Sequence, residues 1–224
     1  MTHLDIELKQ LKEEAIEMFD LVTSQFKKSK SALINNDAEL AREVNFNERR
    51  VNALELKIDK DCENIFALFN PLAVDLRFVL AVLKINSNLE RIGDIADGIA
   101  RYVVETSTSF DKELIAATQL EEMFDTAITM LTDVRSSFDT EDTKLARGIF
   151  IKDDALDSIN AKANSVVEQF IKAHTDKIGQ CLHIISTIRK LERTGDQVKN
   201  VAEEIIFYIE AKVLKHLSAK AKAE

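Results

Sequence analysis

The chain has 224 residues, a formal net charge of −9, one proline and five glycines. Its length suits one large domain or two of about 100 residues each, and its 46% of hydrophobic residues excludes a disordered chain. The acidic charge disfavours direct binding to nucleic acid because it repels the phosphate backbone, and the scarcity of proline and glycine disfavours a fold of short strands and tight turns.

The N-terminal residues Met1–Asp5 lack the apolar stretch of a signal peptide. No apolar run in the sequence reaches the roughly 20 residues that a bilayer-spanning helix needs. Cys62 and Cys181 stand far apart and form no CxxC pair, which favours two buried thiols in a reducing compartment. We therefore expect a cytoplasmic protein that reaches membranes only through partner proteins.

Apolar residues at three- and four-residue steps predict three helices in the first half of the chain. The first begins near Leu4 and ends near residue 35, where Asn35–Asp37 breaks the pattern and supplies an N-cap. The second ends at Asn70, because the residue before Pro71 is pushed out of the helical region. The third spans about 73–105.

The second half shows the same periodicity after a polar connection at Thr106–Asp111. We predict helices over about 112–138, from the turn at 139–142 to Ala173, and from Asp176 to His216, with a tail at Ser218–Glu224 that frays. Helix lengths repeat in the order medium, long, long. The sequence therefore predicts an all-α fold of six long helices in two tandem three-helix bundles, residues 1–108 and 109–224, produced by internal duplication.

A hexapeptide recurs at equivalent places in the two halves. Leu89–Asp94 lies in the third predicted helix and Leu191–Asp196 in the sixth, and five of the six residues match. Each copy holds a Glu and an Asp four residues apart, on one helix face. At 100° per residue the acidic rows continue, as Glu90, Asp94 and Asp97 in the first copy and Glu192, Asp196 and Glu203, with Asn200 beside them, in the second.

The preceding helix of each half carries a matching polar row. These rows are Glu48, Asn52, Glu55 and Asp59 in the first half, and Asp153, Asp157, Asn160 and Asn164 in the second. If each helix pair folds as an antiparallel hairpin, Glu48 lies level with Asp94 and Asp153 lies level with Asp196. Clustered carboxylates need cations or raised pKa values, and all-oxygen ligands suit magnesium, manganese, calcium or ferric iron.

A solvated polar face with Glu–Arg pairs is an alternative explanation of the same rows, and both hypotheses stay open. The rows on the third and sixth helices lie away from much of the apolar stripe, so a bound metal is expected near the bundle surface. Gly93 and Gly195 each cost about 1 kcal/mol within a helix. Their repetition indicates close approach, either by a neighbouring helix or by an ion cluster. Arg91 and Arg193 either neutralise the acids or extend into solvent.

Three segments together resemble the PhoU family: Asn47–Asn52, the Pro-x-x-x-Asp-Leu-Arg run at Pro71–Arg77, and Leu89–Asp97. In the second half, Asp153–Asp157 and Leu191–Asp196 with Asn200 and Glu203 resemble a second repeat. The resemblance covers about residues 5–216 and implies two tandem three-helix bundles. It also implies negative regulation of phosphate uptake and phosphate-starvation signalling, without enzyme activity.

The family resemblance further implies partners and ligands. The partners are the ATPase of the high-affinity phosphate ABC transporter and a phosphate sensor histidine kinase, and we expect a homodimer. The implied cofactors are multinuclear iron or zinc clusters on the bundle surface. The implied metal ligands are Glu48, Asn52, Glu90, Asp94, Asp97, Asp153, Asp157, Glu192, Asp196, Asn200 and Glu203.

The sequence departs from the family pattern in the first site. Asn52 stands where an acid would complete the motif, and Gly98 stands where the second half has Asn200. We therefore expect the first site to hold metal differently or more weakly. The second half lacks the Pro-x-x-x-Asp-Leu-Arg turn and has Asp176–Gln180 in its place.

The sequence argues against catalysis. A di-iron carboxylate enzyme would use Glu-x-x-His pairs, and none of the four histidines has a glutamate three residues before it. The nucleophile elbow and the P-loop are also absent. The remaining alternatives are a helical accessory protein of a low-affinity phosphate permease and a metal-free helical adaptor.

Overall fold

The computed structural model describes residues 2–106, 109–214 and 222. Within these residues the chain is helical throughout, and no strand occurs. The elements are α1 (His3–Asn35), α2 (Ala38–Phe69), α3 (Ala73–Thr106), α4 (Lys112–Ala117), α5 (Leu120–Thr140), α6 (Thr143–Ala173), the 3-10 turn η1 (Thr175–Lys177) and α7 (Ile178–Glu210). None of the described helices is long and apolar enough to cross a membrane.

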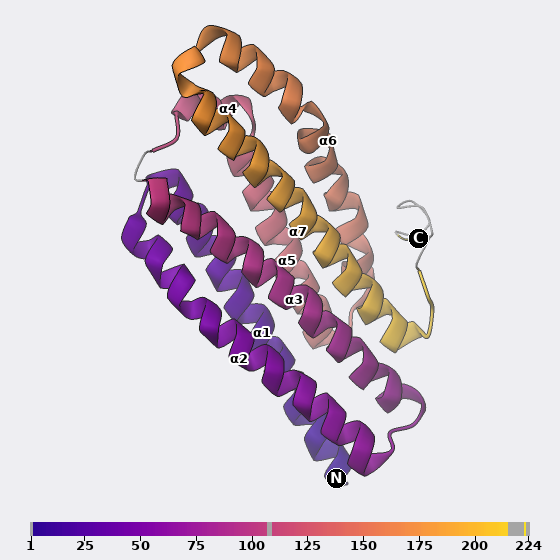
Figure 1. The fold of residues 1–224 in the computed structure, drawn as a ribbon. Helices are drawn as coiled ribbons and strands as arrows, with labels where there is room; N and C mark the ends of the chain where they lie inside the picture. The colour runs from indigo at the N-terminus through magenta and orange to yellow at the C-terminus, as the bar shows by residue number, and fades with distance from the viewer. Residues whose placement is uncertain (1, 107–108, 215–221, 223–224) are drawn as a thin grey trace.

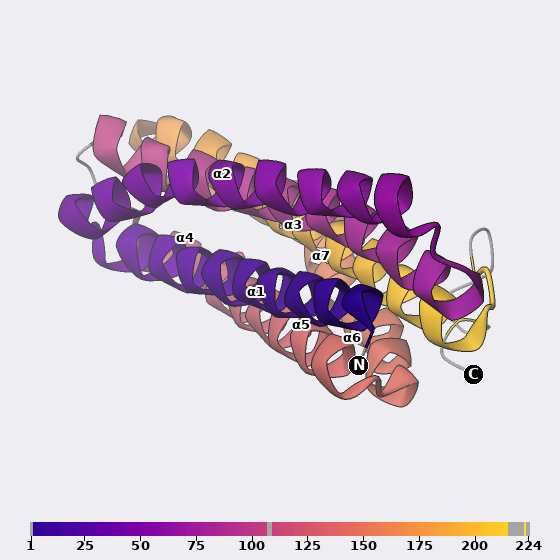
Figure 2. The same ribbon diagram turned by 90° about the horizontal axis from the view of Figure 1, so that it is seen from below.

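The helices form two three-helix units that lie side by side (Figure 1). In the first unit α1 packs against α2 and α3, and in the second α5 packs against α6 and α7. The units meet where α3 contacts α7 and where α1 contacts α5. One layer therefore runs in the order α2, α3, α7, α6, with α1 and α5 behind it (Figures 1 and 2). The predicted tandem bundles are confirmed.

Both units use the same turn between their first two long helices. Asn36 and Glu141 take left-handed backbone conformations, with φ of 53° and 57°. Asp37 and Asp142 then cap α2 and α6, and each side chain accepts hydrogen bonds from two backbone amides of the first helical turn. Such caps satisfy amides that have no partner within the helix. The repeated turn supports the predicted duplication.

One hydrophobic core runs through both units. Four aromatic side chains from four helices meet where the units join. Phe138 of α5 lies 5.5 Å from Phe19 of α1 and 6.2 Å from Phe78 of α3, and Phe78 lies 5.5 Å from Tyr208 of α7, measured between ring centroids. The units therefore share apolar contacts rather than forming two separate cores.

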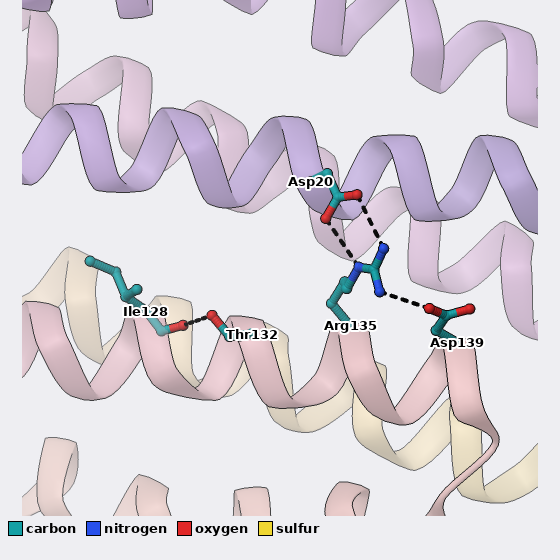
Figure 3. Close-up of polar contacts among 5 residues, drawn as sticks. All are labelled: Asp20, Ile128, Thr132, Arg135 and Asp139. Carbon is teal, nitrogen blue, oxygen red and sulfur yellow. Dashed lines mark hydrogen bonds and ion pairs between the residues drawn. The ribbon is translucent and has the colours of Figure 1, made fainter.

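A surface contact also joins α1 to α5 (Figure 3). The Arg135 guanidinium donates from Nε to Asp20 Oδ1 at 3.0 Å and from Nη1 to Asp139 Oδ2 at 2.8 Å. Beside it, the Thr132 hydroxyl donates to the backbone carbonyl of Ile128. Exposed pairs of this kind contribute about 0–1 kcal/mol, so the aromatic contacts dominate this junction.

The structure corrects two predicted helices. The helix predicted over 112–138 is divided, because Gln119 has a φ of 53° and separates α4 from α5, which continues to Thr140. The helix predicted to reach His216 ends at Glu210, where Ala211 takes a φ of 56°. His216 lies outside the described residues, as does the tail predicted to fray, apart from Lys222. The boundary predicted between 108 and 109 stays a prediction.

Candidate functional site

The repeated glycines allow close helix packing within each unit. A Cβ atom on Gly93 of α3 would lie 3.1 Å from Val51 of α2, and a Cβ atom on Gly195 of α7 would lie 2.5 Å from Asp153 Oδ1 and 2.6 Å from Leu156 of α6. The interpretation as tight packing by a neighbouring helix is confirmed. This approach brings the acidic rows of each helix pair together.

The first acidic cluster consists of Glu48, Glu90, Asp94 and Asp97, between α2 and α3. Glu48 is buried, and both its carboxylate oxygens accept no hydrogen bond within the described residues. Burial, followed by repulsion from Asp97, Asp94 and Glu90, raises the pKa of Glu48 to about 7. The predicted register of this hairpin is confirmed, since Glu48 lies beside the motif acids.

Among the described residues, Asp97 is the one acid of this cluster whose carboxylate has direct donors. Asn45 Nδ2 donates to Asp97 Oδ1 at 2.6 Å, and Arg101 pairs with Asp97 Oδ2 from one turn along α3. These contacts offset the charge of Asp97 but leave Glu48 without a donor. The cluster therefore contains a buried carboxylate surrounded by like charges.

The α2 row continues toward the Pro71 turn with the exposed Asn52 and then the half-buried Glu55 and Asp59. Asn52 is exposed, so the structure does not bring it into the first cluster. Burial and the charges of Asp59 and Asp94 raise the pKa of Glu55, and the side chain of Asn86 donates to Asp59 Oδ1 at 2.8 Å. Asp59, the member of the predicted row nearest Pro71, thus has an amide donor from α3.

The second acidic cluster consists of Asp153, Asp157, Glu192, Asp196 and Glu203, between α6 and α7. Lys199 lies within it and pairs with Asp153 Oδ2 and, at 2.7 Å, with Asp196 Oδ1. This shared lysine confirms the predicted register. Burial raises the pKa of Asp153 to about 6 against the opposing effect of Lys199, and its Oδ1 accepts no hydrogen bond within the described residues.

An open groove of about 510 Å³ exposes this second cluster to solvent. Its lining includes Asp153, Asp157, Asp196 and Lys199. At one end Lys222 Nζ lies 2.5 Å from Glu203 Oε1. Asn200 lies on the rim, and its amide donates to Asn88 Oδ1 of α3 at 3.3 Å. The second cluster therefore holds two internal cations, whereas Arg101 alone among the described residues pairs with an acid of the first.

Four of the cluster acids are buried, which argues against a merely solvated polar face, whereas Asp94 and Asp157 are exposed. The exposed fractions of the buried acids are 9% for Glu48, 5% for Asp97, 3% for Asp153 and 8% for Glu203. In the part of the chain described, no three His, Cys, Asp or Glu side chains converge in metal-binding geometry. The unpaired buried oxygens of Glu48 and Asp153 nevertheless fit a bound cation, because hard cations are held by oxygen ligands of this kind and an unpaired buried carboxylate is costly.

Sequence reasoning missed three polar partners of the clusters: Asn45, Arg101 and Lys199. Asn45 stands three residues before Glu48, Arg101 four after Asp97, and Lys199 three after Asp196. Residues at these spacings share a helix face, so the signal was present. Arg101 and Lys199 were missed because the predicted rows contained only acids and amides, and Asn45 was missed because it precedes Glu48, the first residue of its row.

Comparison with known proteins gives a consistent match. The PhoU domain matches this chain twice, over residues 15–103 and 120–205. The phosphate-specific transport system accessory protein PhoU of Edwardsiella tarda is 32% identical to this chain, and the match covers 94% of this chain and 86% of that protein. The homologue from Aquifex aeolicus is also 32% identical, with coverage of 97% and 98%.

Solved structures show the same arrangement of helices. The crystal structure of PhoU from Pseudomonas aeruginosa superposes with a TM-score of 0.87 at 27% identity, over 94% of this chain and 100% of that one. The phosphate transport system regulatory protein PhoU from Streptococcus pneumoniae gives a TM-score of 0.80 at 25% identity, over 94% and 99%.

Proposed function

This chain belongs to the PhoU family, and from that premise we propose that it restrains phosphate uptake and phosphate-starvation signalling when phosphate is plentiful. The observation that carries this proposal is the double match of the PhoU domain, to which the names of the relatives add phosphate-specific transport. The relatives are named as accessory proteins, and the chain is correspondingly not an enzyme.

Within this role the protein works in the cytoplasm as a homodimer. It couples the ATPase of the high-affinity phosphate ABC transporter to a phosphate sensor histidine kinase. Support for the transporter comes from the names of the relatives, and support for the kinase comes from the family resemblance of the motifs. Contact with a membrane is made through these partners.

The acidic clusters are the proposed metal sites. Glu48, with Glu90, Asp94 and Asp97, would hold metal in the first unit, and Asp153, with Asp157, Glu192, Asp196 and Glu203, would hold it in the second. A bound iron, zinc, magnesium or manganese ion would neutralise the carboxylates. The protein's own contribution is to hold the acids of two helices at one height, and Lys199 substitutes for part of that positive charge.

The regulatory role is tested by alkaline phosphatase activity in phosphate-replete cells that lack this gene, with and without a plasmid copy. We expect high activity that the plasmid restores to a low level. Unchanged low activity in the deletion strain would contradict negative regulation. The permease-accessory alternative would then be examined through the transporter genes that neighbour this one.

The metal assignment is tested separately, by the metal content of the purified protein. Replacing Glu192 and Asp196 with alanine should lower bound metal without unfolding the protein. Glu121→Ala/Asp125→Ala is a matched control, because these exposed acids of α5 have the same identities and the same spacing. Equal metal content in both variants would contradict the assignment of Glu192 and Asp196 as ligands, and absence of metal from the unmodified protein would favour a metal-free adaptor.

A further inference from the structure

A second groove lies between α3 and α7, separate from the groove at the second acidic cluster. This central groove is lined by Arg91, Asp94, Ile95, Lys190, Arg193 and Gln197, and it has a volume of about 390 Å³. Three of its six lining side chains are basic, in a protein whose net charge is −9. The excess of positive charge here is therefore local and contrasts with the flanking acidic clusters.

The duplication explains why the basic residues converge. Contacts of α3 with α7 at Lys84–Glu204, Asn88–Asn200 and Gly98–Lys190 show that the two helices run antiparallel in one register. This register sets Gly93 level with Gly195. Arg91 and Arg193 occupy the same place in the two hexapeptides, so they fall on opposite sides of this level and line one groove.

The basic side chains of the groove have acids nearby, Glu90 beside Arg91 and Glu192 beside Arg193, but form no direct ion pair with them among the described residues. Within the described chain, neither Arg91 nor Arg193 has a carboxylate oxygen within 4.0 Å of its guanidinium nitrogens. Lys190 Nζ donates to the Gly98 carbonyl oxygen at 3.1 Å, which is a neutral partner. Burial, followed by the neighbouring Arg101, lowers the pKa of Lys190 against the opposing effect of Asp97.

The groove also presents acceptors, which narrows the chemistry of its ligand. Gln197 of α7 lines this groove and also the groove at the second acidic cluster, and its buried Oε1 accepts no hydrogen bond within the described residues. Asp94 lines the central groove from α3. A fully deprotonated anion would meet these acceptors unfavourably. Hydrogen phosphate, in contrast, offers oxygens to the basic side chains and an O–H group to an acceptor.

We propose that the central groove binds inorganic phosphate as hydrogen phosphate, held by Arg91, Lys190 and Arg193 and distinguished from sulfate by Gln197 and Asp94. Arginine matches the geometry of phosphate oxygens through paired N–H donors. Lysine adds a point charge, and its Nζ retains two further donors beyond the bond to Gly98. The ligand would bridge the two repeats at their junction.

The test is a calorimetric titration of the full-length, chelator-treated protein with inorganic phosphate, and separately with sulfate. We expect saturable phosphate binding that Arg91→Gln/Arg193→Gln weakens by about a hundredfold, since each of the two charge-assisted contacts contributes about a factor of ten. Arg42→Gln/Arg49→Gln removes the same charge from exposed positions of α2 and should bind phosphate like the unmodified protein.

The acceptors are tested with Asp94→Asn in the same metal-free titration. This change should reduce the preference for phosphate over sulfate, because the asparagine side chain can donate a hydrogen bond to a sulfate oxygen, whereas the aspartate carboxylate can only accept one. Circular dichroism of each variant checks that its helices are retained. The proposal is overturned by absence of saturable phosphate binding, by equal weakening in the α2 control, or by sulfate binding as well as phosphate to the unmodified protein.

Discussion

At the residue scale, the two acidic clusters differ by an exchange of charges. In α3 Asp97 pairs with Arg101 one turn later. Alignment of the two hexapeptides puts Lys199 and Glu203 at the same two positions of α7. An acid beside Glu48 in the first cluster is thus replaced by a lysine beside Asp153 in the second. Both clusters keep the same excess of acids over paired cations, but within the described residues Glu48 has no cation partner, whereas Asp153 pairs with Lys199.

This imbalance predicts that the stability of the metal-free protein falls as pH rises from 5 to 8. Glu48 has a folded pKa of about 7 against an ordinary value of 4.5, so the folded state holds the proton more tightly than the unfolded state. The stabilisation from protonated Glu48 is lost between these two pKa values. Glu48→Gln should remove on the order of 2 kcal/mol of this pH dependence.

Urea unfolding in the presence of a chelator at both pH values measures this effect. Glu63→Gln is the matched control, since Glu63 is exposed on the same helix and should leave the pH dependence unchanged. A Glu48→Gln variant that loses stability between pH 5 and 8 as steeply as the unmodified protein would show that Glu48 is ionised at both values.

Three helical glycines should respond to alanine in a fixed order. Gly148 has nothing within 4 Å of an added Cβ atom, whereas the added atom would lie 3.1 Å from Val51 at Gly93 and 2.5 Å from Asp153 at Gly195. Gly148→Ala should stabilise the protein by up to about 1 kcal/mol through helix propensity. Overpacking costs of about 1–3 kcal/mol should make Gly93→Ala less favourable and Gly195→Ala the least favourable.

Denaturant midpoints of the three variants, compared at one pH, check this order. The substitution at Gly148 supplies the internal control for propensity. If Gly195→Ala proved as stabilising as Gly148→Ala, the close packing of α6 on α7 at Asp153 and Leu156 would be refuted.

At the element scale, the sequence was informative wherever a turn carried its own chemistry. The predicted turns at Asn35–Asp37 and Asn70–Pro71 are confirmed, because asparagine tolerates left-handed backbone, aspartate caps helices and proline ends them. The breaks at Gln119 and Ala211 were missed, because neither residue prefers a positive φ. There, packing in the bundle overrides local preference, and this cannot be read from one sequence.

Gln119 should therefore be strained, and glycine should relieve that strain. A non-glycine residue in the left-handed region costs about 1 kcal/mol, so Gln119→Gly should stabilise the protein or leave it unchanged. Gln169→Gly, at an exposed position within α6, should destabilise it by about 1 kcal/mol. Thermal unfolding of the two variants distinguishes these outcomes. Equal destabilisation would mean that Gln119 does not adopt the left-handed backbone conformation.

At the scale of the whole molecule, the shared core predicts one cooperative unfolding transition for both repeats. Phe138 is fully buried and contacts aromatic rings from α1, α3 and α7. Phe138→Ala should lower the free energy of unfolding by about 3–5 kcal/mol while leaving a single transition. Phe46→Ala, at a side chain that is 70% exposed, should change it by about 0.5 kcal/mol or less.

Coincidence of circular dichroism with fluorescence from single probes placed in α2 and in α6 would verify this cooperativity. Two separate transitions would instead indicate independent halves, as the sequence-based division at 108 and 109 would allow. The sequence predicted the number of long helices and their pairing. Apolar periodicity alone does not show whether the two bundles share one hydrophobic core or have separate cores.

The antiparallel contact between α3 and α7 makes each chain equivalent to a tethered pair of ancestral subunits. A single three-helix ancestor would have met a second copy through this same helix face, in a two-fold symmetric contact where residue i of one copy opposes residue j of the other and j opposes i. Fusion replaced a concentration-dependent encounter with a high effective concentration. It also allowed the two copies to differ, as they do where Asp97 of one repeat corresponds to Lys199 of the other. Gene fusion thus turned a symmetric homodimer into a molecule with two distinguishable faces.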